Sequence, residues 1–106
     1  MITALIVDDE PGIRAVLSEL LAGLDLDVVE ARNGVEATRV IESEQPDLML
    51  LDLKMPEKDG MTLLREFTGS PPCTIVVLTA HGTVSDAVEA MKLGAFDFLQ
   101  KPFDPS

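Results

Sequence analysis

Three aspartates at the ends of apolar runs are the residues most able to do chemistry. Asp8 is the last residue of the run "ALIVD" and Asp9 follows it, while Asp52 is the last residue of the run "DLMLLD". If these runs are neighbouring parallel strands, the three carboxylates meet and repel one another strongly. Either raised pKa values keep some of them protonated, or a hard cation neutralises them. A small, partly wet site made only of oxygen ligands suits Mg²⁺, so we predict a magnesium site.

Two further strand ends carry polar groups that complement this cluster. Thr79 supplies a hydroxyl in "LTA", Ala80 follows it with a small side chain, and Lys101 supplies an ammonium in "QKP". A cation on one side and a hydroxyl and an ammonium on the other would cradle a phosphoryl group, whose transfer depends mainly on positioning and charge neutralisation. Asp52 could then act as the nucleophile and form an acyl phosphate.

Alternating strand-like and helix-like segments must position these groups. Strands are expected at 4–8, 26–31, 47–52, 74–80 and 95–101, and helices at 12–24, 33–43, 60–68 and 83–94. This alternation predicts an α/β fold, a doubly wound parallel sheet with helices on both faces. The first, third and fourth strands are unbroken apolar runs and should be central, whereas charged residues interrupt the second and fifth. The flavodoxin-like order 2-1-3-4-5 fits, and its switch point lies at the carboxyl ends of the first and third strands.

Length, net charge and cysteine content limit the classes of function that this protein can have. The chain has 106 residues, which suggests one domain, and its net charge of −11 disfavours binding to nucleic acid or anionic membranes. The first residues show neither a signal peptide nor a membrane span, so we expect a cytoplasmic protein. Cys73 is the one cysteine and is expected to be a buried or half-buried thiol rather than a nucleophile.

Four motifs together resemble the receiver domain of bacterial two-component response regulators. They are "DDE" at 8–10, "LLDLKMPEKDG" at 50–60, "TA" at 79–80 and "KPF" at 101–103. The resemblance covers nearly the whole chain, and the stretch 82–103 is most like the nitrogen-regulator class of transcriptional activators. It implies a signalling switch rather than a turnover enzyme, with a sensor histidine kinase or phosphotransfer protein as partner.

The resemblance also implies the metal ligands. Asp52 would accept the phosphoryl group from a phosphohistidine. Asp9 would bind Mg²⁺ directly and Asp8 mostly through water, and the backbone carbonyl of Lys54 would add another oxygen. Glu10 is left outside this set, as a residue that starts the following helix, where its charge meets the helix dipole.

The remaining family roles concern the phosphoryl group and the switch. Lys101, the Thr79 hydroxyl and the backbone N–H of Ala80 would contact the phosphoryl oxygens, with a cis bond before Pro102 aiming the lysine. On phosphorylation Thr79 would move inward and Phe98 would follow it, although Phe98 could equally be an ordinary core residue of the edge strand.

Lys54 and His81 are expected at the rim of the site, where they would alter the lifetime of the phosphoryl group, although His81 is more simply an exposed loop residue. Pro56 and Gly60 would shape the loop after Asp52, and Gly60 is expected to supply a positive φ.

The sequence ends at "KPFDPS", where Asp104 and Pro105 are typical of a helix start. Receivers normally have a fifth helix here, so we expect residues 1–106 to be a single receiver domain that stops before its last helix. Apolar residues of strands one, four and five would then be open to water, which predicts lower stability or self-association. The fourth helix and fifth strand are the other expected contact surface.

Three other functions remain open on the same fold. A dehalogenase-like phosphatase also uses a strand-end aspartate and Mg²⁺, but it needs a second acid where Lys54 stands. A flavin or nucleotide binder needs a glycine-rich loop that is missing after the first strand. A receiver-like interaction module that is never phosphorylated would not need the full set of acids and the lysine.

Overall fold

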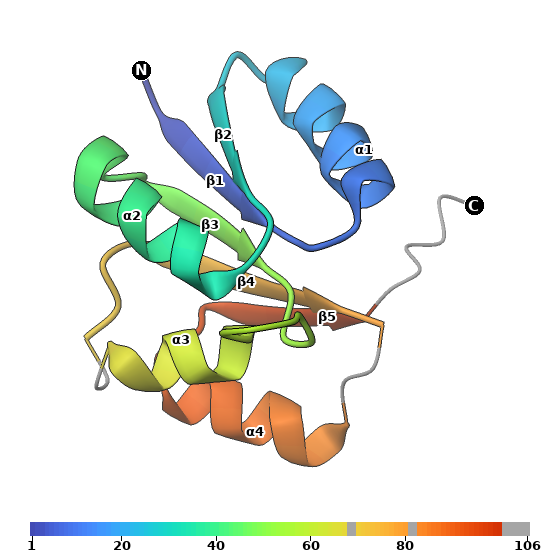
Figure 1. Ribbon diagram of the computed structural model, residues 1–106, viewed down its shortest axis with the longest axis vertical. Helices are drawn as coiled ribbons and strands as arrows, with labels where there is room; N and C mark the ends of the chain where they lie inside the picture. Colours follow the sequence, from blue (N-terminus) through green and yellow to red (C-terminus); the bar gives the residue numbers. More distant parts are fainter. Residues whose placement is uncertain (68–69, 81–82, 101–106) are drawn as a thin grey trace.

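The protein is described by a computed structural model over residues 1–67, 70–80 and 83–100, in which strands alternate with helices along the chain (Figure 1). The elements are β1 (Thr3–Val7), α1 (Pro11–Ala22), β2 (Asp27–Ala31), α2 (Gly34–Glu44), β3 (Leu48–Leu51), α3 (Gly60–Glu66), β4 (Thr74–Thr79), α4 (Val84–Lys92) and β5 (Asp97–Gln100).

The strands form one parallel sheet in the order β2-β1-β3-β4-β5, which confirms the predicted fold and strand order. Val7 pairs with Ala31 on one side and with Leu51 on the other, and Leu51 in turn pairs with Val77. The central strands β1, β3 and β4 are apolar on both faces because helices cover both faces. The polar positions of β2 and β5 are compatible with the edges, where one flank meets water.

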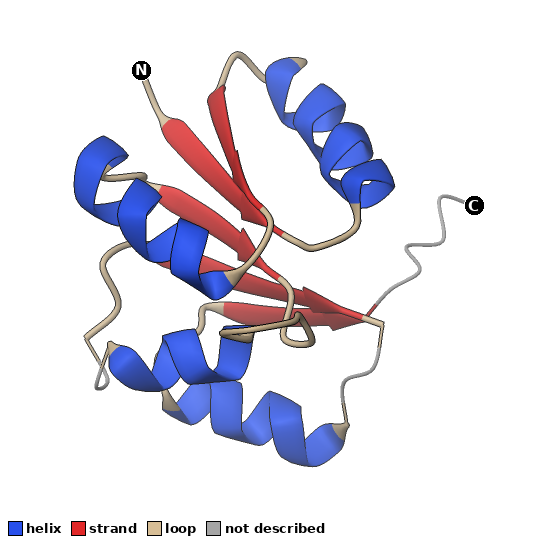
Figure 2. Ribbon diagram, in the orientation of Figure 1, coloured by secondary structure: helices blue, strands red, loops and turns tan. Residues whose placement is uncertain are grey.

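Helices cover the two faces unequally, as Figures 1 and 2 show. The larger core lies between the sheet and α2, α3 and α4, and it includes Ala37, Leu63, Leu64 and Ala90. The smaller core lies under α1 and is centred on Ile6, Leu17 and Leu78. Within the described ranges, no helix combines the length and the apolar character needed to cross a membrane.

Helix boundaries follow local signals in the sequence. The Asn33 side chain accepts a hydrogen bond from the Glu36 N–H (2.8 Å), so Asn33 is the N-cap of α2. Gly94 ends α4 at φ 107°, and the N–H of Ala95 donates to Ala90 O (3.0 Å). This pairing is a Schellman motif, which commonly ends a helix at a glycine.

The apolar stripes of two helices are only partly used in the core. Leu17 of α1 is buried, but Leu20 and Leu24 are 63% and 69% exposed. α1 ends at Ala22, before the predicted end at position 24, and the chain turns through a left-handed Asp25 (φ 60°). On α4, Val84, Val88 and Met91 are exposed, although their helical spacing puts them on one face of the helix.

The sheet face under α1 is less open than the sequence suggests. Ile6 of β1 and Leu78 of β4 are buried, so the expectation of solvent-exposed apolar residues is wrong for these two. Both belong to the cluster that packs with Leu17 of α1. Leu99 of β5 is 46% exposed, as expected. The expected helix start at Asp104 and Pro105 lies outside the described residues.

Candidate functional site

The carboxyl edge of the sheet brings Asp8 and Asp52 onto adjacent strands. The N–H of Asp52 donates to Val7 O (2.9 Å), and the N–H of Asp8 donates to Ala31 O (3.1 Å). The ladder therefore continues one residue beyond the paired residues Val7 and Leu51. This geometry fixes the backbone of both aspartates at the switch point of the sheet, where open α/β folds bind ligands.

Burial of polar side chains is concentrated at this edge. Asp8 is 2% exposed, Asp52 is 5% and Thr79 is 0%, and no other polar or charged side chain of the described residues is buried to this extent. Removing charged groups from water is costly unless they are compensated. This edge, where the buried polar side chains gather, is therefore the candidate functional site.

Asp8, Asp9 and Glu10 form a compact acidic group. Each offers one carboxylate oxygen, and these atoms all lie within 4.8 Å of one another. Asp8 is buried, while Asp9 and Glu10 face solvent. An all-oxygen donor set that is open on one side fits a hard cation such as Mg²⁺. The predicted ligands Asp52 and the Lys54 carbonyl lie in the segment that follows the neighbouring strand.

Glu10 was not predicted as a member of this acidic group. It is the N-cap of α1 with Pro11 at the first helical position, which confirms its place at the helix start. Its N–H donates to Asp8 Oδ1 (2.9 Å), and this tight turn brings the Glu10 carboxylate back toward the aspartates. The sequence signal was the "DDE" run itself, read together with the helix start at Pro11.

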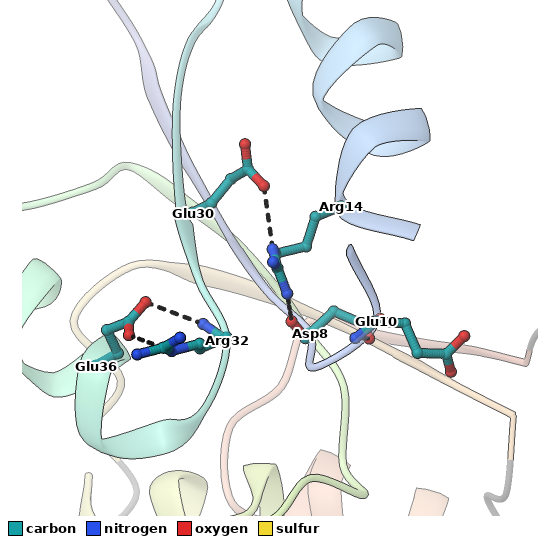
Figure 3. A network of polar contacts seen from close by, with 6 residues as sticks. All are labelled: Asp8, Glu10, Arg14, Glu30, Arg32 and Glu36. Atoms are coloured by element: carbon teal, nitrogen blue, oxygen red, sulfur yellow. Dashed lines mark hydrogen bonds and ion pairs between the residues drawn. The ribbon is translucent and has the colours of Figure 1, made fainter. Parts of the chain in front are cut away.

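Arg14 is a second residue that the sequence reasoning missed. Its Nη1 donates to the backbone carbonyl of Asp8 (2.6 Å), and its Nε donates to Glu30 Oε1 (3.1 Å). Figure 3 shows the guanidinium spanning the space between these two partners, from α1 to the end of β1 and to β2. Arg14 lies one helical turn after Glu10, which is the only signal of this role in the sequence.

The loop after Asp52 packs directly beneath the start of α3. The Lys54 N–H donates to Asp52 Oδ1 at 3.4 Å, and the Gly60 N–H donates to Leu53 O (3.1 Å). A Cβ atom at position 60 would lie 2.1 Å from Asp52 O. The prediction of a positive φ at Gly60 is wrong, because Gly60 is the first residue of the right-handed helix α3. A glycine is needed at this position because there is no room for a Cβ atom beside Asp52. Glu57 adopts the left-handed conformation instead (φ 63°).

The same loop is tied to the α2 side of the molecule through Lys58. The Gly34 N–H donates to Lys58 O (2.8 Å), and Lys58 Nζ donates to Thr38 Oγ1 (2.9 Å) and pairs with Glu66. These contacts connect α2, the loop and α3. They hold the segment that carries Asp52 and Lys54 against two helices.

Thr79 and Phe98 lie on the same face of the sheet. Phe98 pairs with Val77, and Thr79 lies two residues after Val77 on β4. Phe98 is half-buried against the larger core, which supports its reading as a core residue of the edge strand. Ala80 follows Thr79 and is exposed at the rim. Lys101, Pro102 and His81 lie outside the described residues.

Cys73 lies at the opposite edge of the sheet. Burial, assisted by the negative charge of Asp47, raises the pKa of its thiol to about 11, and the side chain is half-buried. Both residues line a hollow of about 660 Å³ together with Pro71 and Thr74. The prediction of a half-buried thiol at Cys73 is confirmed.

Comparison with known proteins settles the family. The model of the response regulator receiver domain matches residues 4–106. The chain belongs to this family. It is 44% identical to the transcriptional regulatory protein GlrR of Escherichia coli K12 over 101 residues, which are 94% of this chain and 23% of GlrR. It is 41% identical to the DNA-binding transcriptional regulator NtrC of the same strain, over 93% of this chain and 21% of NtrC. The chain thus spans less than a quarter of these relatives.

Solved receiver domains share the fold. The beryllofluoride-activated NtrC4 receiver domain dimer superposes with a TM-score of 0.88 and 36% identity, over 98% of this chain and 87% of that one. The signal receiver domain of a putative Luxo repressor protein from Vibrio parahaemolyticus superposes with a TM-score of 0.89 and is 31% identical, over 96% of this chain and 79% of that one. The similarity to NtrC and to the NtrC4 receiver domain confirms the resemblance to the nitrogen-regulator class.

Proposed function

We propose that this receiver domain is a cytoplasmic phosphorylation switch that accepts a phosphoryl group on Asp52 from a sensor histidine kinase or phosphotransfer protein. The single observation that carries the proposal is the convergence of the buried Asp8, Asp52 and Thr79 at the carboxyl edge of the sheet. Family membership over residues 4–106 supports it.

The covalent step needs one nucleophile on this chain. A carboxylate oxygen of Asp52 attacks phosphorus, the O–P bond forms as the P–N bond of the phosphohistidine breaks, and the electron pair stays on the imidazole nitrogen. Hydrolysis by water later releases inorganic phosphate and restores the carboxylate. Asp52 is buried and its loop is held by α2 and α3, so the nucleophile is positioned in advance.

Metal binding is proposed at the acidic group. Asp9 and Asp52 and the carbonyl of Lys54 would hold Mg²⁺, with Asp8 acting mostly through water. The bound ion supplies charge neutralisation for the phosphoryl oxygens. One carboxylate oxygen from each of Asp8, Asp9 and Glu10 lies within 4.8 Å of the others, which supports a cation at this position.

The opposite side of the phosphoryl group would be held by Lys101, the Thr79 hydroxyl and the Ala80 N–H. Thr79 is fully buried at the end of β4, which suits a hydroxyl that reports on the state of Asp52. Movement of Thr79 would be passed to Phe98 on the same sheet face. Lys54 and His81 would control the access of water at the rim.

The output surface is proposed on α4 and β5. On α4, Val84, Val88 and Met91 are exposed and offer apolar contact area to a partner or a second copy. The related NtrC4 receiver domain is a dimer in its beryllofluoride-activated form. Phosphorylation would then control an effector domain or partner and, by analogy with NtrC and GlrR, transcription.

Acetyl phosphate tests the proposal. We expect wild-type protein with Mg²⁺ to gain the mass of one phosphoryl group, and Asp52→Asn to gain none. Asp25→Asn is the matched control, because Asp25 is an exposed acid in a left-handed turn that asparagine tolerates. Absence of an adduct in the wild type would favour a pure interaction module. Steady release of phosphate from unrelated monoesters would favour a phosphatase.

A further inference from the structure

Arg14 connects three elements at the acidic end of the sheet. It is the fourth residue of α1, its N–H donates to Glu10 O (3.1 Å), and its side chain is only 18% exposed. Nη1 reaches the carbonyl oxygen of Asp8, and Nε reaches the carboxylate of Glu30 on β2 (Figure 3). A guanidinium can hold two such partners at once because its donors point in fixed, different directions.

The contact with Asp8 bears on the acidic group. The carbonyl of Asp8 belongs to the same planar peptide unit as the N–H of Asp9. The hydrogen bond from Arg14 therefore limits rotation of the unit that joins the two aspartates. The Asp8 N–H and Oδ1 are held as well, by Ala31 O and the Glu10 N–H. Arg14 adds a further contact to Asp8, from α1.

We propose that Arg14 is a positioning residue that sets the relative orientation of the Asp8 and Asp9 carboxylates for the cation. The inference rests on the proposed function, since it assumes that these acids bind Mg²⁺. Arg14 touches neither the cation nor the phosphoryl group in this role. It acts through the Asp8–Asp9 peptide and is anchored by Glu30 on the neighbouring strand.

Electrostatics alone predicts the opposite effect, which makes the role testable. A guanidinium beside carboxylates repels a cation, so removing its charge should strengthen Mg²⁺ binding if charge were all that mattered. Loss of an outer residue that orients metal ligands instead weakens binding, on the order of 10-fold or more. The sign of the change distinguishes positioning from simple charge repulsion.

The test is the Mg²⁺ dissociation constant of Arg14→Gln, measured by titration calorimetry at a temperature where every variant is folded by circular dichroism. We expect binding about 10-fold weaker than in the wild type. Arg14→Lys keeps the positive charge but loses the planar arrangement of donors, so it is also expected to bind Mg²⁺ more weakly than the wild type. If Arg14→Gln fails to fold, Arg14→Lys alone provides the test. Arg32→Gln is the matched control, because Arg32 pairs with Glu36 on the surface and its removal also deletes one positive charge.

The amide spectra give a second readout. The backbone ¹H–¹⁵N resonances of Asp9 and Glu10 should shift or broaden in metal-free Arg14→Gln and remain unchanged in Arg32→Gln. Wild-type protein that binds no Mg²⁺ overturns the proposed function and this inference with it. Wild-type protein that binds, together with unchanged or tighter binding by Arg14→Gln, overturns only the role of Arg14.

Discussion

The Gly60 backbone lies directly against the carbonyl of Asp52. A Cβ atom at position 60 would approach that oxygen to 2.1 Å and the Leu53 Cα to 2.9 Å, both of them backbone atoms that cannot move aside without shifting the loop. The start of α3 and the loop that carries the candidate nucleophile are therefore packed as one unit. The helix N-cap Asp59, whose side chain accepts from the Thr62 N–H, fixes this junction.

We expect Gly60→Ala to lower the free energy of unfolding by about 3 kcal/mol or more, because the added methyl group overlaps backbone atoms. Urea denaturation measures the loss. Gly12→Ala is the control, because a Cβ at Gly12 meets nothing within 4 Å, and it should raise stability by about 0.5–1 kcal/mol. Equal stability of Gly60→Ala and the wild type would contradict the packing described above.

Lys54 should govern the lifetime of the phosphoryl group. Its side chain is exposed at the rim, while its expected metal contact uses the backbone carbonyl, which every substitution retains. We expect Lys54→Ala to shorten the lifetime of phosphorylated Asp52 by more than it changes the Mg²⁺ dissociation constant, because water gains access. Decay of the phosphorylated protein, followed by mass spectrometry, measures the lifetime. Lys92→Ala is the control, and an unchanged lifetime in Lys54→Ala would rule out the rim role.

The capping box of α4 predicts a pH dependence. The Asp86 side chain accepts from the Thr83 N–H (3.1 Å), and this bond, with the Thr83 hydroxyl and Lys54, lowers the pKa of Asp86 below 3.8. A lowered pKa stabilises the fold above the unfolded value, and this contribution is lost as pH falls through the folded value. The stability gap between wild type and Asp86→Ala should therefore be constant above about pH 5 and should narrow in acid.

Urea denaturation at a series of pH values measures this gap. Ser85→Ala, at the adjacent exposed position of α4, should show no comparable change with pH. A gap between wild type and Asp86→Ala that widens in acid would show that Asp86 does not cap the helix as its carboxylate.

Cys73 should react slowly in the folded protein. Burial raises the pKa of its thiol to about 11, so little thiolate is present at pH 8. We expect alkylation by iodoacetamide to be on the order of a hundredfold slower than in the urea-unfolded chain, whose thiol has an ordinary pKa. Similar rates in the two states would mean that the thiol is neither buried nor perturbed.

Most of the fold could be predicted from residue patterns, for physical reasons that particular strands illustrate. The unbroken runs of β1, β3 and β4 reflect burial on two faces, whereas Glu30 and Asp97 mark the edge strands. Periodicity was less informative for α1, where Leu17 is buried but Leu20 at the next turn is exposed. Helical spacing identifies a stripe, but it does not say how far the sheet extends beneath it.

The candidate site shows the same limit. The aspartates at strand ends could be located because parallel strands end at one edge. The roles of Gly60 and Arg14 could not be predicted. The role of Gly60 depends on its close approach to Asp52, and the role of Arg14 depends on its contacts with Asp8 and Glu30. Glu10 illustrates an intermediate case, because it does start α1, yet the turn stabilised by Asp8 also brings its carboxylate into the acidic group.

The central claim is that Asp52 itself carries the phosphoryl group, and chemical mapping tests it most directly. Wild-type protein is treated with acetyl phosphate, with Mg²⁺ or with EDTA, and is then reduced with borohydride, which converts an aspartyl phosphate to homoserine. Peptide mass spectrometry then locates the change. We predict homoserine at position 52 only in the sample treated with Mg²⁺. An unmodified Asp52 alongside a phosphoryl group on any other residue would contradict the account.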